Sequence, residues 1–316
     1  MSIRINSSIV VLIGSIILIG CSNDQEVKKT NLKPEFDHKE KRVVENKIED
    51  NYDVSFFSGK AEVSTYSLDK ARYDGVHSGE SVLIFVTEPF LAKKQVKSDD
   101  SKSEEVLQIL KMNRIDRFST GIYDYSIFTS AFTPTQKYSP KFPLKLTFSS
   151  QDWCGQSFMQ LNNNNGFEFM LRSYFESEGD TSMQMEYNYT EDNLFNMARI
   201  DTALLPTGEF ELIPSLSFIR LSHKELKPYV ANGSIAVFEN QIVYTYDIPA
   251  LKRGVRIFMN PDEHFQIMRW EETYPTIFDG KLRKSVYTLK KSIKTPYWER
   301  NTTKDKVWRD SLRLLS

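Results

Sequence analysis

From residue 54 onward, short apolar and polar runs alternate along the chain in a way that favours β-strands. Residues Ala61–Tyr66 alternate, and Ser81–Val86 form an apolar run that Pro89 closes. Runs rich in β-branched and aromatic residues and bounded by Gly, Pro, Asn or Asp are typical of strands. Further strands are expected at Val106–Lys111, Gly121–Phe132, Leu144–Phe148, Phe167–Tyr174, Phe210–Arg220, Ile235–Phe238, Ile242–Tyr246, Val255–Met259, Phe265–Trp270 and Val286–Ile293.

Turn signals separate these runs. The asparagine tract Asn162–Gly166 and the segment Asn260–Glu263 predict turns, and Asn232-Gly233 is the strongest hairpin signal. One helix is expected, with Thr190 as its N-cap and an end near Pro206. Short strands with one or two short helices predict a mainly β fold, an antiparallel sandwich or a barrel-like curved sheet.

The N-terminus carries a different pattern. Arg4 precedes an apolar run from Ile9 to Ile19, which is short for a membrane span of about 20 residues and suits a signal peptide. Leu18-Ile19-Gly20-Cys21 resembles the bacterial lipobox, in which the cysteine receives a diacylglycerol and becomes the mature N-terminus. This resemblance implies lipidation of Cys21, and the following Ser22-Asn23 implies sorting to the outer membrane.

These signals divide the chain into four parts. Residues 1–20 are the expected signal peptide, and residues 21–53 are the lipidated cysteine and a charged tether. Residues 54–294 form the expected β-rich globular domain, as one domain or as two packed β subdomains. Residues 295–316 form a C-terminal tail rich in basic and aromatic residues.

Composition excludes several functional classes. The chain has 41 basic and 42 acidic residues, so it lacks the basic excess of a nucleic-acid-binding protein. Aromatic residues make up 13%, which is too many for a disordered chain. The two cysteines cannot build a disulfide framework, and lipidation of Cys21 leaves Cys154 as the free thiol.

Cys154 is the candidate for catalysis, in the motif Asp152-Trp153-Cys154-Gly155-Gln156. A thiol hydrolase or transferase needs a histidine base, and no spacing selects His223 or His264. Since cysteine is often buried and this one precedes a strand-like run, the sequence favours a packed, inert thiol and no catalytic residue.

Other site chemistry is sparse. The four histidines lack metal-ligand spacing, so neither a metal nor a cofactor is expected. Asp201-Thr202-Ala203 and Asp310-Ser311-Leu312 resemble three-residue O-glycosylation sites of Bacteroidetes-type envelope proteins, which implies candidate acceptors at Thr202 and Ser311.

The basic tail offers a second kind of site. Between Lys281 and Arg309 there are ten basic residues and two acidic ones, interleaved with aromatic residues. One interpretation is a strap packed over an acidic body. The other is a docking surface for anionic headgroups, lipopolysaccharide or an acidic partner, formed by Lys290, Lys291, Lys294, Trp298 and Arg300.

Several segments together resemble a family of uncharacterised Bacteroidetes-type lipoproteins of about 300 residues. They are Tyr66–Tyr73, Val82–Glu88, Lys94–Lys97, Thr120–Tyr123, Trp153–Gly155, Tyr174–Asp180 and Pro296–Trp298. Members often carry the label "septum formation inhibitor Maf". The chain lacks the Ser-rich, Pro-Arg-Arg motif of true Maf nucleotide pyrophosphatases, so the resemblance carries over no catalytic residue.

The sequence therefore favours a non-enzymatic binding or structural lipoprotein of the cell envelope, anchored in the outer membrane by its lipid. Its expected partners are the membrane, envelope proteins or lipopolysaccharide, and no nucleic acid. One alternative is a thiol-dependent hydrolase or transferase, which requires a histidine within hydrogen-bond reach of an exposed Cys154. The other is a lipid or lipoprotein carrier, which requires a large apolar groove in a curved sheet.

Replacing Cys21 by alanine tests the anchor. We expect Cys21→Ala to block processing or release the chain from membranes, because several acyl chains on one cysteine hold a domain stably. The measurements are the intact mass and membrane fractionation. An unchanged mass with unchanged membrane retention would rule out lipidation at this residue.

Overall fold

A computed structural model describes residues 56, 58–101, 105–135 and 141–314, all of them in one compact unit, Ile48–Ser316. The expected signal peptide, Cys21 and the tether lie outside the described residues. The strands are β1 Ala61–Arg72, β2 Gly75–Leu91, β3 Val96–Lys97, β4 Val106–Thr120, β5 Tyr123–Pro134, β6 Lys145–Asp152, β7 Gly155–Asn163, β8 Phe167–Ser173, β9 Thr181–Met185, β10 Tyr189–Thr190, β11 Gly208–Ile213, β12 Tyr229–Phe238, β13 Gln241–Ile248, β14 Arg253–Asn260, β15 Gln266–Pro275 and β16 Leu282–Thr295.

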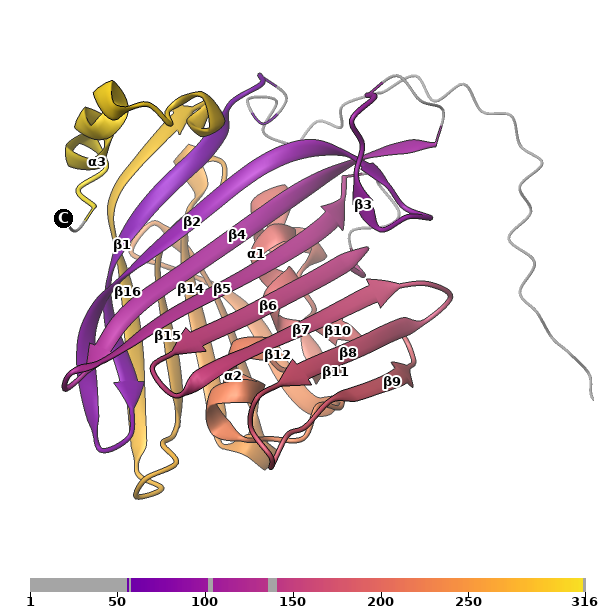
Figure 1. Ribbon diagram of the computed structural model, residues 1–316, viewed down its shortest axis with the longest axis vertical. Coiled ribbons are helices and arrows are strands. Elements are labelled where there is room, and N and C mark those ends of the chain that lie inside the picture. The colour runs from indigo at the N-terminus through magenta and orange to yellow at the C-terminus, as the bar shows by residue number, and fades with distance from the viewer. Residues whose placement is uncertain (1–55, 57, 102–104, 136–140, 315–316) are drawn as a thin grey trace, which may run out of the picture. The chain divides into compact units, whose positions relative to one another are not determined.

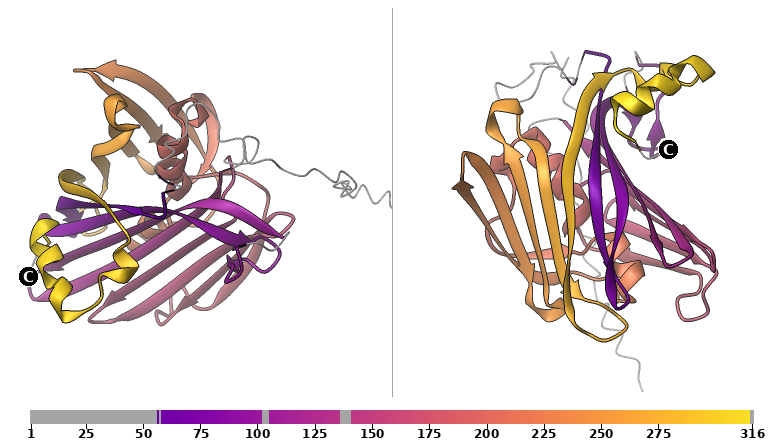
Figure 2. Two further views of the ribbon diagram at one scale, coloured as in Figure 1. Left: turned by 90° about the horizontal axis from the view of Figure 1, so that it is seen from above. Right: turned by 90° about the vertical axis from the view of Figure 1, so that its left-hand side faces the viewer.

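All these strands belong to one curved sheet. Its order is β10-β11-β12-β13-β14-β15-β16-β1-β2-β4-β5-β6-β7-β8-β9, with β3 added beside β2. Neighbouring strands are antiparallel except β10 and β11, and the last strand β16 pairs with the first, β1. The sheet curves around two helices, α1 Glu191–Ile200 and α2 Leu216–Ser222, as Figures 1 and 2 show. The expected mainly β fold with a curved sheet is confirmed.

Both helices are buried along their whole length, on the concave face of the sheet. On α1 the apolar residues pack into the core, and its polar residues bond to the strands beneath. The Asn196 amide donates to the carbonyl oxygens of Leu110 and Ala131, each at 3.1 Å, and Arg199 pairs with Glu62 of β1. These bonds give the Asn196 amide nitrogen and the Arg199 guanidinium partners on the strands, which offsets part of the cost of burying them.

A network of buried charges connects α1 to strands from both halves of the sheet. Glu272 on β15 accepts from Arg114 of β4 at 2.9 Å and from Arg253 of β14 at 3.3 Å. Arg253 also donates to Glu191 at the start of α1, at 3.0 Å. Burial alone opposes the ionisation of Glu272, yet Arg114, Lys70 and Arg253 hold its pKa well below the usual range. Glu272 therefore remains ionised at neutral pH.

An aromatic stack lies beside this network. The Trp270 ring stacks on Tyr287 at 4.0 Å and meets Phe195 of α1 edge-on at 5.5 Å. Its indole nitrogen donates to Glu272 at 3.3 Å. Aromatic pairs in this geometry contribute about 0.5–1.5 kcal/mol beyond their buried area.

The first turn of α1 also caps α2. The backbone N–H of Ser215 donates to Glu191 at 3.2 Å, and that of Leu216 donates to Asp192 at 3.0 Å. The carboxylates thus satisfy N–H groups that every helix N-terminus leaves free. This explains why α2 begins at Leu216 without a side-chain cap from Ser215.

Most expected elements are present. The turn in the asparagine tract connects β7 to β8, the turn at Pro261–Glu263 connects β14 to β15, and the expected helix is α1. Thr190 is its N-cap residue but makes no capping bond, and α1 ends at Ile200, before the expected Pro206. The strand expected at Phe210–Arg220 is wrong in its second half, where Leu216–Ser222 form α2.

The predicted hairpin turn at Asn232-Gly233 is also wrong. Both residues lie inside β12, and the turn to β13 is formed by Glu239 and Asn240. A Cβ at position 233 would lie 2.5 Å from the Pro206 carbonyl oxygen and 3.0 Å from the Tyr244 hydroxyl. Gly233 is required for this close approach and not for a turn.

Burial raises the pKa of Asp192 to about 6, although the Leu216 N–H stabilises its ionised form. Because this folded-state pKa lies above the unfolded value of 3.8, the contribution of Asp192 to stability is present below pH 4 and lost as pH rises through 6. We expect Asp192→Asn, which keeps an acceptor, to match the wild type near pH 4. At pH 7.5 it should be more stable by about 2–3 kcal/mol.

Urea unfolding of both proteins between pH 4 and pH 8 measures this difference. Glu191→Gln is the control, because it removes the partner of Arg253 and should destabilise the protein. A difference between wild type and Asp192→Asn that does not change with pH would contradict the assignment.

Candidate functional site: a groove on the convex face

The Asp152–Gly155 motif forms the turn between β6 and β7. The Asp152 carboxylate accepts the backbone N–H groups of Cys154 at 2.9 Å and Gly155 at 3.2 Å, and the Tyr123 hydroxyl at 2.7 Å. Asp in the first position of a turn and Gly in the last are typical of a type I turn. The aspartate thus places Trp153 and Cys154 at the tip of the hairpin.

The expectation that Cys154 is packed is wrong, because the thiol is exposed. Apolar alternation would bury it only if a strand ran through position 154, whereas the chain reverses there. No hydrogen bond joins Cys154 to any histidine that the structure describes. His223 lies 3.3 Å from Glu178, and His77 lies 3.1 Å from the Arg72 carbonyl oxygen. The arrangement that a thiol hydrolase needs is therefore not met among the described residues.

Trp153 borders a groove of about 680 Å³ on the convex face of the sheet. Side chains from four neighbouring strands lie in one row across its floor, since Glu80 pairs in register with Arg117, Arg117 with Ser126, and Ser126 with Gln151. Asp124, Ser119 and Arg309 also line it. The sequence motif around Cys154 and the basic tail thus meet at the same groove.

Three residues of the row are available to a ligand. Arg117, Ser126 and Gln151 are exposed, and none of these side chains has a hydrogen bond or an ion pair with another described residue. At one end of the row, Glu80 accepts from Lys290 at 2.8 Å. The groove therefore offers a guanidinium, a hydroxyl and an amide beside the exposed indole of Trp153, a set that donates and accepts hydrogen bonds.

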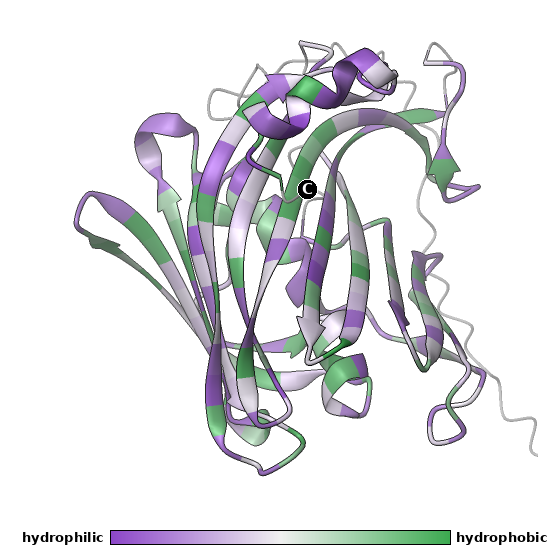
Figure 3. Ribbon diagram, turned by 60° about the vertical axis from the view of Figure 1, so that its left-hand side comes forward, coloured by the Kyte–Doolittle hydropathy of each residue, from purple (hydrophilic) through white to green (hydrophobic). Residues whose placement is uncertain are grey.

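The C-terminal tail packs against the convex face (Figure 3), and its Arg309 borders this groove. It contains the short helix α3 Val307–Ser311, and Leu312 packs with Ala61, Val63 and Val86. The Leu312 carbonyl oxygen accepts from the Thr65 hydroxyl at 2.6 Å. These contacts favour the strap over the free docking element.

The candidate docking residues are divided between two elements, with Lys290, Lys291 and Lys294 on β16 and Trp298 and Arg300 on the tail. Lys290 donates to the Arg313 carbonyl oxygen at 2.6 Å, and the Arg300 guanidinium lies over the Trp308 ring at 4.8 Å. The Lys294 ammonium group lies 5.9 Å from the centre of the Phe56 ring. Lys291 and Trp298 are exposed. The bases therefore do not form one free surface, because Lys290 and Arg300 have partners within the domain.

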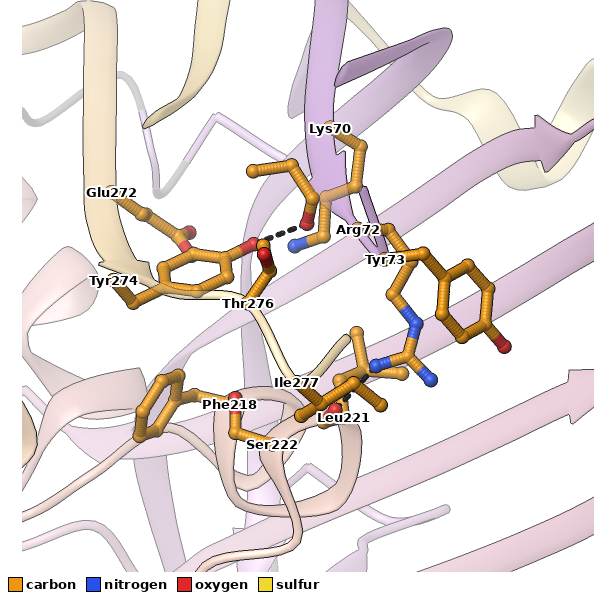
Figure 4. Close-up of a pocket in the computed structure, with 11 residues that line it drawn as sticks. Lys70, Arg72, Tyr73, Phe218, Leu221, Ser222, Glu272, Tyr274, Thr276 and Ile277 are labelled. Carbon is orange, nitrogen blue, oxygen red and sulfur yellow. Dashed lines mark hydrogen bonds between the residues drawn. The ribbon is translucent and has the colours of Figure 1, made fainter. Parts of the chain in front are cut away.

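A second pocket lies on the concave side, between β1, α2 and the loop after β15 (Figure 4). Lys70, Arg72 and Glu272 line it together with the Tyr274 ring, whose hydroxyl donates to the Ala71 carbonyl oxygen at 2.8 Å. Its free volume is about 10 Å³, which is room for a single water molecule. It is too small for the acyl chain that a lipid carrier would hold.

The remaining expected sites are accessible to different degrees. Thr202 is half-buried at the start of a 3-10 turn, and Ser311 is exposed on α3. In the described part of the chain, no group of three His, Cys, Asp or Glu side chains is arranged to hold a metal ion. None of the described helices combines the length and apolar character needed to cross a membrane.

Comparisons of the chain with family models, with curated proteins and with solved structures found no match. The family resemblance noted in the sequence therefore stays a prediction.

The strap can be tested at its apolar contact. Leu312 is 8% exposed, and Leu312→Ala should lower the free energy of unfolding by about 2 kcal/mol because it removes buried methyl groups. Leu282→Ala is the matched control, since Leu282 is 60% exposed and should change stability by less than about 0.5 kcal/mol. Thermal and urea unfolding give both values, and equal effects of the two changes would mean that the tail does not pack as described.

Proposed function

We propose that this protein is a lipid-anchored component of the bacterial cell envelope, held in the outer membrane through Cys21, which binds another envelope component without catalysing a reaction. The groove on the convex face is its ligand site. The observation that carries the proposal is the row of Arg117, Ser126 and Gln151, whose polar groups have no partner among the described residues.

Two features of the domain support this assignment. The concave face, where a carrier would hold its lipid, is filled by α1, α2 and the charge network around Glu272. The exposed Cys154 has no histidine as a base in the described residues, which disfavours the hydrolase. Within the described residues, neither alternative finds the feature that it requires, whereas a binding protein requires only an accessible surface with unsatisfied groups.

The preferred ligand is an extended polar segment of another envelope protein. The row crosses four strands, so an extended chain that lies over it meets Arg117, Ser126 and Gln151 in turn. Arg117 lies inside this row, and Arg is enriched among the residues that dominate binding energy.

Site-specific photo-cross-linking in intact cells tests the proposal. A photoreactive residue at Gln151 should capture a defined envelope protein, whereas the same residue at Val96, an exposed position on β3, should not. Adding Arg117→Glu should reduce capture at Gln151 at least tenfold, because loss of a charged hydrogen-bond partner typically costs 2 kcal/mol or more.

Arg117 is exposed, so this change should leave the thermal midpoint unaltered. Capture of the same proteins at Gln151 and Val96, or capture that Arg117→Glu does not reduce, would refute the groove as the ligand site.

A further inference from the structure

Six short connections between neighbouring strands turn at the same end of the described domain, which is the lower end in Figure 1. Strand pairing establishes this, because the end of β4 pairs with the start of β2, the end of β6 with the start of β5, and the end of β8 with the start of β7. The start of β16 likewise pairs with the ends of β1 and β15. The turns β1–β2, β4–β5, β6–β7, β8–β9, β13–β14 and β15–β16 therefore lie at one end of the domain, the turn end.

Large apolar side chains stand on four of these turns. Ile122, Trp153, Tyr174, Phe278 and Leu282 are each 60–82% exposed. A single exposed apolar residue needs no explanation, but this set gathers at one end of the domain and includes three aromatic residues. Figure 3 shows hydrophobic colouring on the lowest loop, between β15 and β16.

The arrangement of these side chains favours a lipid surface over a protein partner. They are distributed over four separate turns, with charged residues such as Asp74, Asp124 and Lys281 between them. A protein interface needs a continuous, desolvated core, whereas a bilayer surface admits separate apolar tips wherever they meet it. Trp and Tyr are also the residues enriched at the boundary of lipid and water.

The charges of this end select the kind of headgroup. Asp279 forms a two-point ion pair with Arg283, at 2.6 and 2.8 Å, and is 3.7 Å from Lys281. Acidic residues on the other turns, including Asp74, Asp124 and Asp152, offset the bases. A mixed surface of this kind suits zwitterionic headgroups, because an anionic surface attracts segments with an excess of lysine and arginine.

We infer that the turn end is a membrane-docking surface, and that its partner is a bilayer with zwitterionic phospholipid headgroups. Ile122, Trp153, Tyr174, Phe278 and Leu282 insert at the level of the headgroups. The chain before the described domain allows this contact. The segment from residue 21 to residue 55 spans at most about 120 Å at roughly 3.3–3.6 Å per residue, so a lipid on Cys21 leaves the turns free to reach a membrane.

Cys154 provides a reporter for the contact, because it lies on the β6–β7 turn and is exposed. In the mature chain carrying Cys21→Ser it is the single cysteine, since the sequence has two. An environment-sensitive fluorophore on this thiol should shift to shorter wavelength when phosphatidylcholine vesicles are added. Raising the salt concentration should leave the shift intact, because apolar insertion is not screened.

A matched control uses the opposite end of the sheet. Val237 lies near the β12–β13 turn and is 76% exposed, so a fluorophore on Val237→Cys in a Cys154→Ser background should show no shift. In the Cys154-labelled chain, Ile122→Ser combined with Phe278→Ser should weaken vesicle binding at least tenfold, and Val237→Ser should not change it. All three positions are exposed, and thermal midpoints confirm that the variants fold.

Three results would overturn the inference. They are an absence of any shift at Cys154, an equal shift at position 237, and binding that requires anionic lipid and disappears in salt. The last result would assign membrane contact to the basic tail. This test leaves Arg117 and Gln151 unchanged and uses no protein partner, so its outcome is independent of the cross-linking at the groove.

Discussion

Glu272 occupies the point at which the two halves of the sheet and the first helix are joined. Its carboxylate lies between Arg114 from β4 and Arg253 from β14, strands that are far apart in the sheet order, and Arg253 continues to Glu191 on α1. Removing one charge from such a buried set leaves the others uncompensated, which costs about 3–5 kcal/mol. The Glu272 carboxylate with its two arginine partners thus connects β4, β14 and, through Arg253, the start of α1.

This network has a consequence for function. Charges that are buried and paired with one another are not available to a ligand, and the helices that they fix fill the concave face. The small pocket beside Lys70 has room for one water molecule. On the convex face, Arg117, Ser126 and Gln151 are accessible and have no side-chain partner in the described part of the chain, and exposed apolar groups lie on the turns. Because helices and paired charges fill the concave face, the groups that can bind a ligand lie on the convex face.

The basic C-terminal segment both packs against the sheet and borders the groove. Its bases and aromatic residues suggested either a strap or a docking surface, and the contact of Leu312 with Ala61 and Val63 supports the strap. The same strap brings Arg309 to the groove. A segment whose apolar side chain stabilises the sheet thereby supplies a charged wall to the candidate binding site.

Local signals in the sequence were sufficient for the mainly β class, for most strands, for α1 and for the asparagine turn, because alternation and positive-φ residues act over a few neighbours. They failed where distant contacts decide the structure. Asn232-Gly233 predicts a turn, but Gly233 lies inside β12, where the absence of a side chain lets Pro206 and Tyr244 approach the backbone. Residues Leu216–Ser222 form a helix because Glu191 and Asp192 cap its start. Asp152 and Gly155 are typical turn residues and predict an exposed Cys154, whereas the general tendency of cysteine to be buried predicts the opposite.

The sequence by itself determined the apolar alternation, the candidate lipidation site at Cys21 and the residue types available for a site. The strand pairings were decided by the tertiary structure, since the row from Glu80 to Gln151 exists only when β2, β4, β5 and β6 lie in register. The physical reason is that a strand pattern specifies which face a side chain occupies, but not which strand lies beside it. Which strands pair is decided by the free energy of burial and charge pairing over the whole domain, and no single segment of the sequence contains that information.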